Sequence, residues 1–494
     1  MKPIRVAFTP PPGIILSETS FSLPGQWSAG NNVRPDGDRM QPIGGWDTIN
    51  AATGVDGTAT NLHEWFSNNG TRYLIIGHTA GCEVLSGSSL GSATDIIYGG
   101  FTSATRWSFA NYGEQPLACP AGGTLYYWDL NTANNLVAIS NAPDNITVIG
   151  MDDETGQVMA FGANEETSGT FNPRCIRTSG ARDRDLWTTT ASNIAREYIL
   201  QGQGGQIRAA KKVGAGWAVW TDTELFYGLY QGDLAQPWRW NLIATGCGAL
   251  GPDTVTVADG VAYWISRDLR PMMWAPGATP IEIGGLPTSY ITGDTLSVDK
   301  NGLTNAFTWH NRKFNEIWFH LVVSGQTYPT IYVAVNVDSL RTSQPQWFPG
   351  TMSRSVIYQG AYQPMGFSFG SGSAVLREHE VGKNGQTGQL LTCSISAWVY
   401  MGEGEQRVQI LRMIPDIKDQ AGTLTCTITS YRDPQGSAIA TKTISLAAGQ
   451  DKADFSISGN LFKIEFSSND GTGATDTFWR LGRCLFEFVG RGRY

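Results

Sequence analysis

The chain has 494 residues, of which 59 are glycine and only 16% are charged, and its formal net charge is −8. At this length we expect two or more domains, or one large closed β architecture with an appendage. The acidic balance argues against a groove that grips nucleic acid by its phosphates, although it permits a passage through which nucleic acid slides. No run of 18 apolar residues is present, so we expect no membrane-spanning helix.

The abundance of glycine, together with 17 Trp, 17 Tyr and 20 Phe, favours many short strands joined by tight turns. Almost no segment keeps the apolar spacing of an amphipathic helix. The seven cysteines are dispersed and form no Cys-x-x-Cys pair, which predicts neither a zinc site nor a disulfide framework and favours a reducing compartment. Prolines at 3 and 10–12 interrupt the place of a signal peptide's apolar core, so we expect no secretion signal.

The N-terminal region, residues 1–49, is predicted to be an extended arm followed by the first strands. Met1 to Pro24 is rich in proline and lacks periodicity, which indicates a segment that packs on something else or stays mobile. Asp36-Gly37 predicts a turn between two short strands.

The middle of the chain, residues 50–385, contains a repeated pattern. Gly216-Trp217-Ala218-Val219-Trp220 is matched, 44 residues later, by Gly260-Val261-Ala262-Tyr263-Trp264. A period of roughly 40–50 residues with several strands per unit is typical of β-propeller blades. The alternative is two adjacent hairpins of an ordinary antiparallel sheet. The propeller hypothesis predicts that Trp220 and Trp264 occupy equivalent strands.

Weaker copies begin near residues 73, 124, 157, 315 and 366, so we predict six or seven blades. After a turn or linker at Gly382 to Gly388, residues 386–494 contain seven short alternating segments, which are typical of a β-sandwich. The expected fold is therefore all-β, with a β-propeller-like domain followed by a C-terminal β-sandwich.

Side chains that could carry chemistry are scattered. The five histidines (His63, His78, His310, His320 and His379) have no metal-ligand spacing, and His320 is expected to be a strand histidine with satisfied hydrogen bonds. Glu378-His379-Glu380 could do acid/base work. On a strand, however, the two glutamates would share one face and His379 would point to the other.

Three further motifs favour plain turns. Asp299-Lys300-Asn301-Gly302 resembles the start of a calcium loop, but its glycine is early and His310 stands where the glutamate ligand belongs. Gln201 to Gly205 is glycine-rich but lacks the Lys-Ser/Thr of a phosphate loop. Gly-x-Ser-x-Gly at 87–91 and 366–370 leads into no helix. We therefore predict no catalytic, cofactor-binding or metal-binding residue, and no enzyme.

Short motifs along the chain resemble a known family. They are Gly25-x-Trp27, Asn32-x-x-Pro35 and Pro42 to Trp46 near the start, Pro173 to Ser179 with Arg182 to Trp187 in the middle, and Phe478 to Arg483 at the end. This pattern resembles the tail nozzle proteins of short-tailed bacteriophages, also called tail accessory or packaged-DNA stabilisation proteins. The resemblance covers most of the chain in order, through short structural motifs.

The resemblance implies a virion protein, made in the host cytoplasm, of which six copies form a tube below the portal and adaptor rings. It implies that DNA passes down this tube, that the tube helps to retain packaged DNA, and that it connects to other tail parts such as fibres, tailspikes and a needle. The proline-rich arm departs from the family. Because prolines lack backbone donors, we hypothesise that the arm lies across a neighbouring subunit. The 43 acidic against 35 basic residues permit a neutral or acidic lumen.

The alternative is a carbohydrate-active β-propeller enzyme or a glycan-binding protein, because a fold does not fix a function. Ser179 to Trp187 superficially resembles the repeated Asp-containing box of propeller sialidases, but it lacks the glycine after the acid and occurs once. A ring of copies favours the nozzle, whereas a monomer or dimer favours the enzyme.

Overall fold

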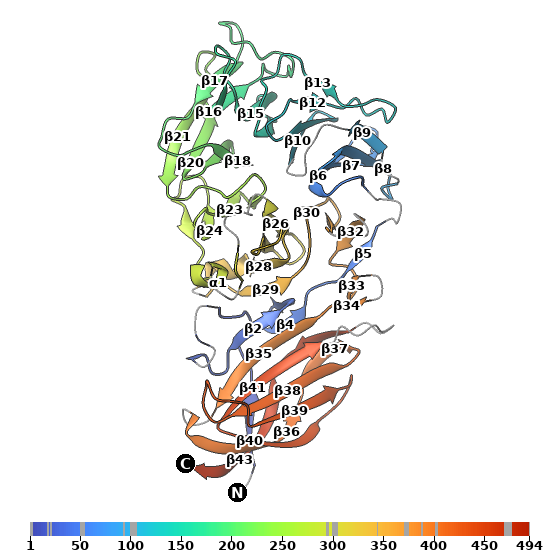
Figure 1. The fold of residues 1–494 in the computed structure, drawn as a ribbon, viewed down its shortest axis with the longest axis vertical. Helices are drawn as coiled ribbons and strands as arrows, with labels where there is room; N and C mark the ends of the chain where they lie inside the picture. The colour runs from blue at the N-terminus through green and yellow to red at the C-terminus, as the bar shows by residue number, and fades with distance from the viewer. Residues whose placement is uncertain are drawn as a thin grey trace.

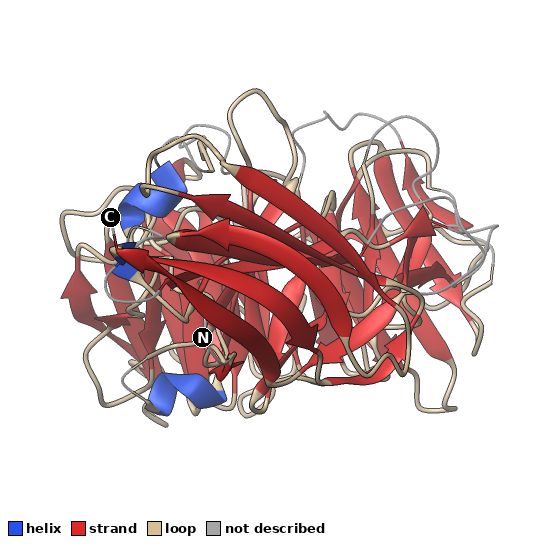
Figure 2. Ribbon diagram, turned by 90° about the horizontal axis from the view of Figure 1, so that it is seen from below, coloured by secondary structure: helices blue, strands red, loops and turns tan. Residues whose placement is uncertain are grey.

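The computed structural model describes residues 3–16, 19, 22–49, 55–91, 94–98, 106–292, 296–298, 305–342, 344–369, 375–386, 389–400, 404–468 and 477–493. The protein is elongated, with a ring of sheets at one end and a stack of longer strands at the other (Figure 1). Strands make up nearly all of its regular structure, and the helices are short (Figure 2). They include α1 (Thr288–Thr292) and the 3-10 helix η3 (Asp338–Arg341). No helix in the described ranges has the length and apolar character needed to cross a membrane.

The ring consists of seven antiparallel four-stranded sheets, which are propeller blades. Blade 1 comprises β6 (Ala59–Phe66), β7 (Arg72–His78), β8 (Gly81–Ser86) and β9 (Thr94–Tyr98). Blade 2 comprises β10 (Trp107–Tyr112), β11 (Gln115–Pro120), β12 (Tyr126–Tyr127) and β13 (Val137–Ala138). Blade 3 comprises β14 (Val148–Asp152), β15 (Gln157–Asn164), β16 (Phe171–Thr178) and β17 (Arg196–Ile199). Blade 4 comprises β18 (Ile207–Val213), β19 (Gly216–Thr221), β20 (Glu224–Tyr230) and β21 (Trp238–Thr245). Blade 5 comprises β22 (Val255–Ala258), β23 (Val261–Ile265), β24 (Pro271–Trp274) and β25 (Ile281–Glu282).

The last two blades close the ring. Blade 6 comprises β26 (Phe307–Asn311), β27 (Glu316–Leu321), β28 (Ile331–Asn336) and β29 (Trp347–Thr351). Blade 7 comprises β30 (Val356–Gln359), β31 (Pro364–Phe367), β32 (Leu376–His379) and, as its outermost strand, β5 (Trp46–Thr48) from the N-terminal region. The innermost strands of successive blades contact one another, and β30 contacts β6, so the ring is complete.

The repeated tryptophan pattern marks the second strand of blades 4 and 5. Trp220 lies in β19 and Trp264 in β23, and their rings make an edge contact with centroids 5.4 Å apart. The prediction that they occupy equivalent strands is confirmed. Six of the seven predicted repeat positions fall at second strands, but the one near residue 124 falls at the third strand, β12. The second strand there is β11, which contains prolines at 116 and 120 and none of the β-branched residues that are typical of a strand.

The C-terminal part is a β-sandwich into which the N-terminal strands are woven. One sheet has the order β2-β35-β41-β38-β39 and the other β1-β43-β36-β40, beside a smaller sheet β3-β4-β42-β37 and a hairpin β33-β34. The strands are β1 (Ile4–Phe8), β2 (Trp27–Asn31), β3 (Val33–Asp36), β4 (Arg39–Pro42), β33 (Asn384–Gln386), β34 (Gln389–Leu390), β35 (Cys393–Tyr400), β36 (Gln406–Ile414), β37 (Ile417–Ala421), β38 (Leu424–Tyr431), β39 (Ala440–Leu446), β40 (Ala453–Gly459), β41 (Leu461–Ser468), β42 (Phe478–Leu481) and β43 (Cys484–Arg493). Each of the seven predicted segments contains a strand, whereas β37 and β42 were not predicted.

The N-terminal arm lies on its own chain. Ile4 to Phe8 pair antiparallel with β43, Phe8 is buried against Trp27 and Phe486, and the Ile14 N–H donates to Trp347 O of blade 6 at 2.8 Å. The hypothesis that the arm lies across a neighbour is therefore wrong for described residues 3–16. Burial of Phe8 and Ile14 explains why, and β1 can form a ladder because it contains no proline.

The sandwich and the propeller share one hydrophobic core. A single cluster of buried side chains contains Trp27, Ile395 and Phe466 of the sandwich together with Trp318 and Phe348 of blade 6. The two parts are therefore packed against each other rather than joined by a flexible linker. The predicted fold class, a β-propeller-like domain with a C-terminal β-sandwich, is confirmed.

Candidate functional site

The central channel of the propeller is one of several concave features of the molecule. The innermost strands surround two adjoining cavities of about 330 and 370 Å³. Both are lined by Asn61, Lys211, Lys212, Asp253 and Tyr358, which come from blades 1, 4, 5 and 7. Cavities of this size suit a small polar molecule.

A set of polar contacts centred on Arg106 and Asp253, which we call the strut, spans the channel. Asp253, in the loop before β22, accepts hydrogen bonds from Arg106 Nε at 2.9 Å and from Asn61 Nδ2 at 3.2 Å. Arg106 also donates to Asn305 Oδ1 at 3.1 Å, and Asp253 O accepts from the Thr308 N–H at 2.8 Å. Blades 1 and 2 are thereby tied to blades 5 and 6 across the axis. The Asp253 carboxylate is already paired, so it serves as a structural link rather than as a free acid or base.

The histidines of the channel wall are neutral at pH 7. His63 Nε2 lies 2.9 Å from Asn111 Oδ1, and His310 Nε2 lies 3.1 Å from Asn315 Oδ1. Desolvation lowers the pKa of both histidines. Lys212 pairs with Asp152 at 3.1 Å, whereas Lys211 has no carboxylate partner among the described residues. The channel therefore offers a small ligand polar contacts and two cations, Lys211 and Arg312, that have no carboxylate partner among the described residues.

The Glu378-His379-Glu380 trio is not assembled as one site. His379 is buried and accepts a hydrogen bond from Arg354 Nε at 3.0 Å. Glu380 lies beyond the end of β32 with φ of +62°, and its carboxylate contacts Arg34 and the Gly44 N–H, the latter at 3.0 Å. The prediction that Glu378 and Glu380 share a strand face is wrong, because the strand ends at His379 and its alternation does not reach Glu380.

Glu380 instead belongs to a buried ion network between the sandwich side and blade 6. Arg34 of β3, whose side chain is fully buried, pairs with Glu380 and with Glu316 of β27, the latter at 3.5 Å. Trp318 Nε1 donates to Glu316 Oε2 at 2.9 Å. Burial raises the pKa of Glu316 to about 8, and the nearby Glu380 charge adds to this rise while Arg34 opposes it. The network joins segments far apart in the sequence, and the side chains of Arg34 and Glu316 are fully buried.

His320 departs from its expectation. It lies in β27 as predicted, fully buried, with its ring stacked on Phe307 at a centroid distance of 4.4 Å. Neither ring nitrogen has a hydrogen-bond partner in the described part of the chain. The expectation that this histidine is satisfied within its strand is therefore wrong.

The glycine-rich loop holds an anion supplied by the chain itself. The N–H groups of Gln203 and Gly204 donate to the Glu224 carboxylate at 3.0 and 2.7 Å. The Gly-x-Ser-x-Gly at 87–91 forms a turn after β8, and Ser368 of the second copy contacts Arg354 Nη1 at 3.1 Å. Asp299 to Gly302 lie outside the described residues. The ranges that the structure describes contain no group of three or more His, Cys, Asp or Glu that could hold a metal ion. All seven cysteines are buried.

The segment that resembles the sialidase box is a compact turn of blade 3. The Gly180 N–H donates to Leu186 O at 2.7 Å, and the Asp185 N–H donates to Asp183 Oδ1 at 3.0 Å. Trp187 is buried, with its Nε1 donating to Arg184 O at 2.6 Å. The acidic side chain thus organises the turn's own backbone.

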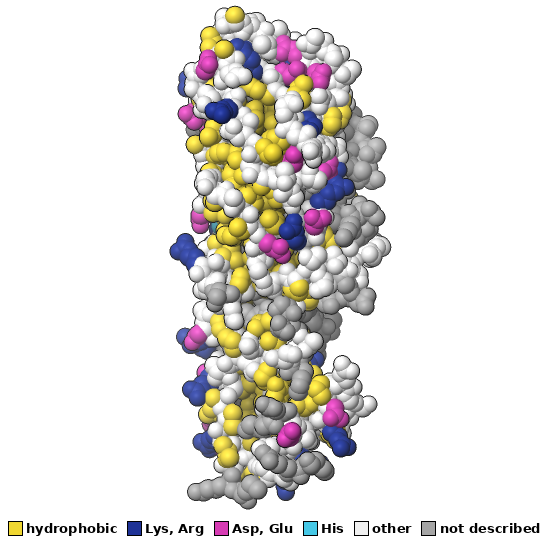
Figure 3. All heavy atoms as spheres, turned by 90° about the vertical axis from the view of Figure 1, so that its left-hand side faces the viewer, with side chains coloured by type: hydrophobic (Ala, Val, Ile, Leu, Met, Phe, Trp, Pro, Cys, Tyr) yellow, Lys and Arg dark blue, Asp and Glu magenta, His cyan; other side chains and the backbone are white. Residues whose placement is uncertain are grey.

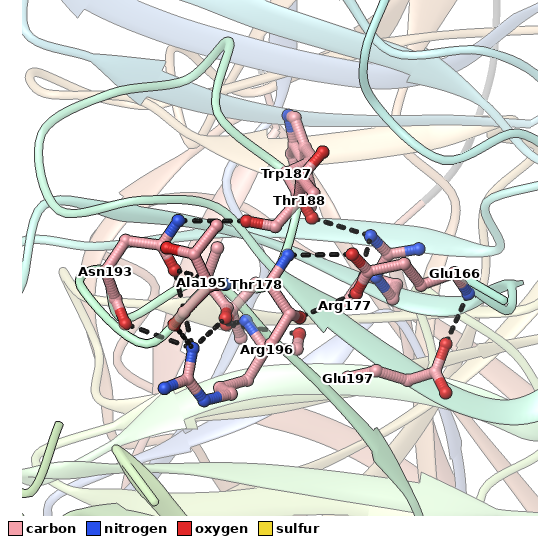
Figure 4. Close-up of polar contacts among 11 residues, drawn as sticks. Glu166, Arg177, Thr178, Trp187, Thr188, Asn193, Ala195, Arg196 and Glu197 are labelled. Carbon is pink, nitrogen blue, oxygen red and sulfur yellow. Dashed lines mark hydrogen bonds and ion pairs between the residues drawn. The ribbon is translucent and has the colours of Figure 1, made fainter. Parts of the chain in front are cut away.

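Two arginines fix the loop that follows (Figure 4). Arg177 donates to Trp187 O at 2.7 Å and pairs with Glu166 at 3.5 Å. Arg196 donates through Nη1 to the carbonyls of Asn193 and Ala195 at 3.0 and 2.6 Å. Both guanidinium groups are occupied by backbone oxygens or a carboxylate, so this cluster holds a loop in place. No pattern in the sequence predicted that Arg177 and Arg196 would hold this loop in place.

The sequence matches no protein-family profile and no curated protein. Among solved structures, the computationally designed Ika8 protein aligns with 75% of this chain and 99% of its own length, with a TM-score of 0.40 and 12% identity. The β-propeller domain of Cps50 (Swd1) from Myceliophteria thermophila aligns with 67% of this chain and 98% of its own length, with a TM-score of 0.41 and 10% identity. The propeller architecture of this chain rests on its seven sheets and the closed ring of inner strands.

Proposed function

We propose that this protein is a structural component of a bacteriophage tail, a protomer of a nozzle ring that conducts DNA and helps to retain it. The observation that carries the proposal is a broken stripe of hydrophobic side chains along one long side of the molecule (Figure 3). On the propeller rim, the outermost strands of blades 3, 4 and 5 expose Ile199, Leu242 and Ile281, whose exposed fractions are 41%, 46% and 50%. Leu234, beside β21, is 47% exposed.

Such a stripe favours burial by a neighbouring subunit. Clustered apolar side chains on a surface mark interaction sites, whereas scattered ones do not. The outermost strand β21 is also eight residues long, with one edge unpaired in its sheet, and long apolar edge strands tend to be covered in a stable assembly. In a head-to-tail ring closed by rotation, each copy would cover this side of the next copy. We infer that six copies form the ring.

The remaining parts of the proposal follow from the ring. The adaptor would lie above it, and fibres, tailspikes or a needle would attach to it or below it. DNA would pass through the lumen between copies, because the propeller's own channel is spanned by the Arg106–Asp253 strut. A basic wall would trap DNA, so the lumen is neutral or acidic in this proposal, in keeping with 43 acidic and 35 basic residues. The protein acts without catalysis.

The proposal is tested by imaging virions of the phage that encodes the chain. Density for a ring of this fold below the portal supports it, and a location outside the tail rejects it. A lumen with a continuous Lys/Arg stripe would reject the sliding role while leaving the ring intact.

The same proposal has a test in solution. We expect Leu242→Glu with Ile281→Glu to prevent ring formation, measured by native mass spectrometry with the adaptor present. Ile439→Glu is the matched control, because Ile439 is 54% exposed but lies in the sandwich near β39. A carbohydrate-active protein, the alternative function, would bind or cleave glycans as a monomer or dimer.

A further inference from the structure

A cluster of basic side chains is buried between blades 6 and 7. Arg354 lies in the linker between β29 and β30, His320 in β27 and His379 in β32. Their exposed fractions are 3%, 0% and 3%. Arg354 donates through Nε to His379 and through Nη1 to Ser353 O at 2.8 Å, and its guanidinium lies 4.5 Å from the centre of the Trp46 ring.

The described residues do not balance the charge of Arg354. No carboxylate of the described residues lies within ion-pair distance of it, and its Nη2 has no hydrogen-bond partner there. Arg34, which is equally buried, pairs with the Glu380 carboxylate and also lies beside Glu316. A buried charge normally requires a counter-charge and full hydrogen bonding. By contrast, Arg354 is left without a counter-charge among the described residues.

The neighbours of Arg354 add donors but no negative charge. Both ring nitrogens of His320 and the Nε of Arg377 lack partners among the described residues. Burial and the nearby Arg377 lower the pKa of Arg354 to about 9, which leaves it charged at pH 7. Burial and the Arg354 charge hold the pKa values of His320 and His379 well below their usual range. Both histidines are therefore neutral, and His320 has a free N–H to donate.

We propose that this cluster binds one small oxyanion, held by the free N–H groups of Arg354 and His320. Nε and Nη1 of Arg354 are already paired, so Nη2 is the nitrogen that remains to donate, and a guanidinium N–H forms a strong charge-assisted hydrogen bond to an oxygen of phosphate, sulfate or carboxylate. Arg354 donates to the carbonyl of exposed Ser353 and to the Oγ of half-buried Ser368, so this is the side of the site nearest to solvent. The site lies beside β5, the N-terminal strand that closes the ring, and a bound anion would strengthen the junction of blades 6 and 7.

The test uses the full-length protein, dialysed free of oxyanions. Phosphate, sulfate and acetate are titrated separately against a chloride background of constant ionic strength, by calorimetry and by thermal unfolding. We expect saturable 1:1 binding of at least one of them and a rise in Tm of about 2 °C near saturation. The three titrations distinguish a tetrahedral oxyanion from a carboxylate.

Arg354→Gln should abolish this binding, while Arg312→Gln should retain it, since Arg312 is exposed and bonded to the carbonyls of Gln359 and Gly360. If Arg354→Gln does not fold, His320→Phe provides the second variant. It keeps the stack on Phe307 and should weaken binding by about tenfold, the value of one lost charge-assisted hydrogen bond. The proposal is overturned if none of the three anions binds saturably, if Arg354→Gln binds like the wild type, or if high-resolution density shows only water at Arg354 Nη2 in phosphate buffer.

Discussion

Glu316→Gln should remove a pH dependence from the stability of the protein. Glu316 is fully buried, and its pKa of about 8 lies far above the usual value of 4.5 for a glutamate. Between these two pH values the folded state holds a proton on Glu316 that the unfolded state has lost. The stabilisation is therefore complete below pH 4.5 and is lost as pH rises through about 8.

The size of the effect follows from the same two pKa values. Each pH unit in this window changes the free energy of unfolding by about 1.4 kcal/mol, and the change levels off near the folded pKa. From pH 6 to pH 8 the wild type should lose about 2 kcal/mol through this group alone. The unfolding entropy grows with chain length, so in a chain of this length that unfolds as one unit a loss of this size lowers Tm by about 2 °C.

The assay compares thermal unfolding of wild type and Glu316→Gln at pH 6 and pH 8. The variant keeps the acceptor for Trp318 Nε1 but cannot ionise, so its Tm should change less than that of the wild type over this range. Glu282→Gln, at an exposed glutamate of β25, should keep the wild-type difference. Equal pH dependence in wild type and Glu316→Gln would refute the assignment of a raised pKa to Glu316.

Three further substitutions test the packing and the strut. Phe8→Ala should cost about 3–5 kcal/mol, because Phe8 is 5% exposed between two aromatic rings, and urea unfolding followed by sandwich-specific hydrogen exchange would detect it; a loss below 1 kcal/mol would mean that β1 is not docked. Asp253→Asn should lower stability by about 1–3 kcal/mol and speed hydrogen exchange in the inner strands, and unchanged exchange would contradict the role of the strut. Gly150→Ala should destabilise by about 1–3 kcal/mol, because an added Cβ would lie 2.1 Å from the Trp217 ring, whereas Gly284→Ala meets no atom within 4 Å and should be tolerated; equal Tm values for these two variants would contradict the described packing.

Local patterns were enough to predict the blades. Trp220 and Trp264 mark second strands because a blade's second strand is buried on both faces, and this burial selects the same small and aromatic residues in each repeat. The pattern failed at β11, where Pro116 and Pro120 replace the usual strand residues. It also did not predict that β5 completes blade 7, since a three-residue strand carries almost no signal.

The polar constellations could not be predicted in the same way. Arg106 and Asp253 are separated by 147 positions, and Arg34 and Glu380 by 346. Only ring closure and the docking of the sandwich bring them together. Glu380 further depends on a backbone φ of +62°, which no residue pattern in Glu378-His379-Glu380 encodes. Sequence spacing describes neighbours along a strand, whereas these contacts depend on the assembled fold.

The pairing of β1, β2 and β4 with β43, β35 and β42 has a consequence for biosynthesis. These N-terminal strands leave the ribosome first, but their partners are translated only after the whole propeller. At about 5–20 residues per second, Trp27 and Val33 must wait tens of seconds before their final burial. A chain that terminates early leaves them uncovered, open to chaperones and proteases. Only completely translated chains can bury these strands against their C-terminal partners.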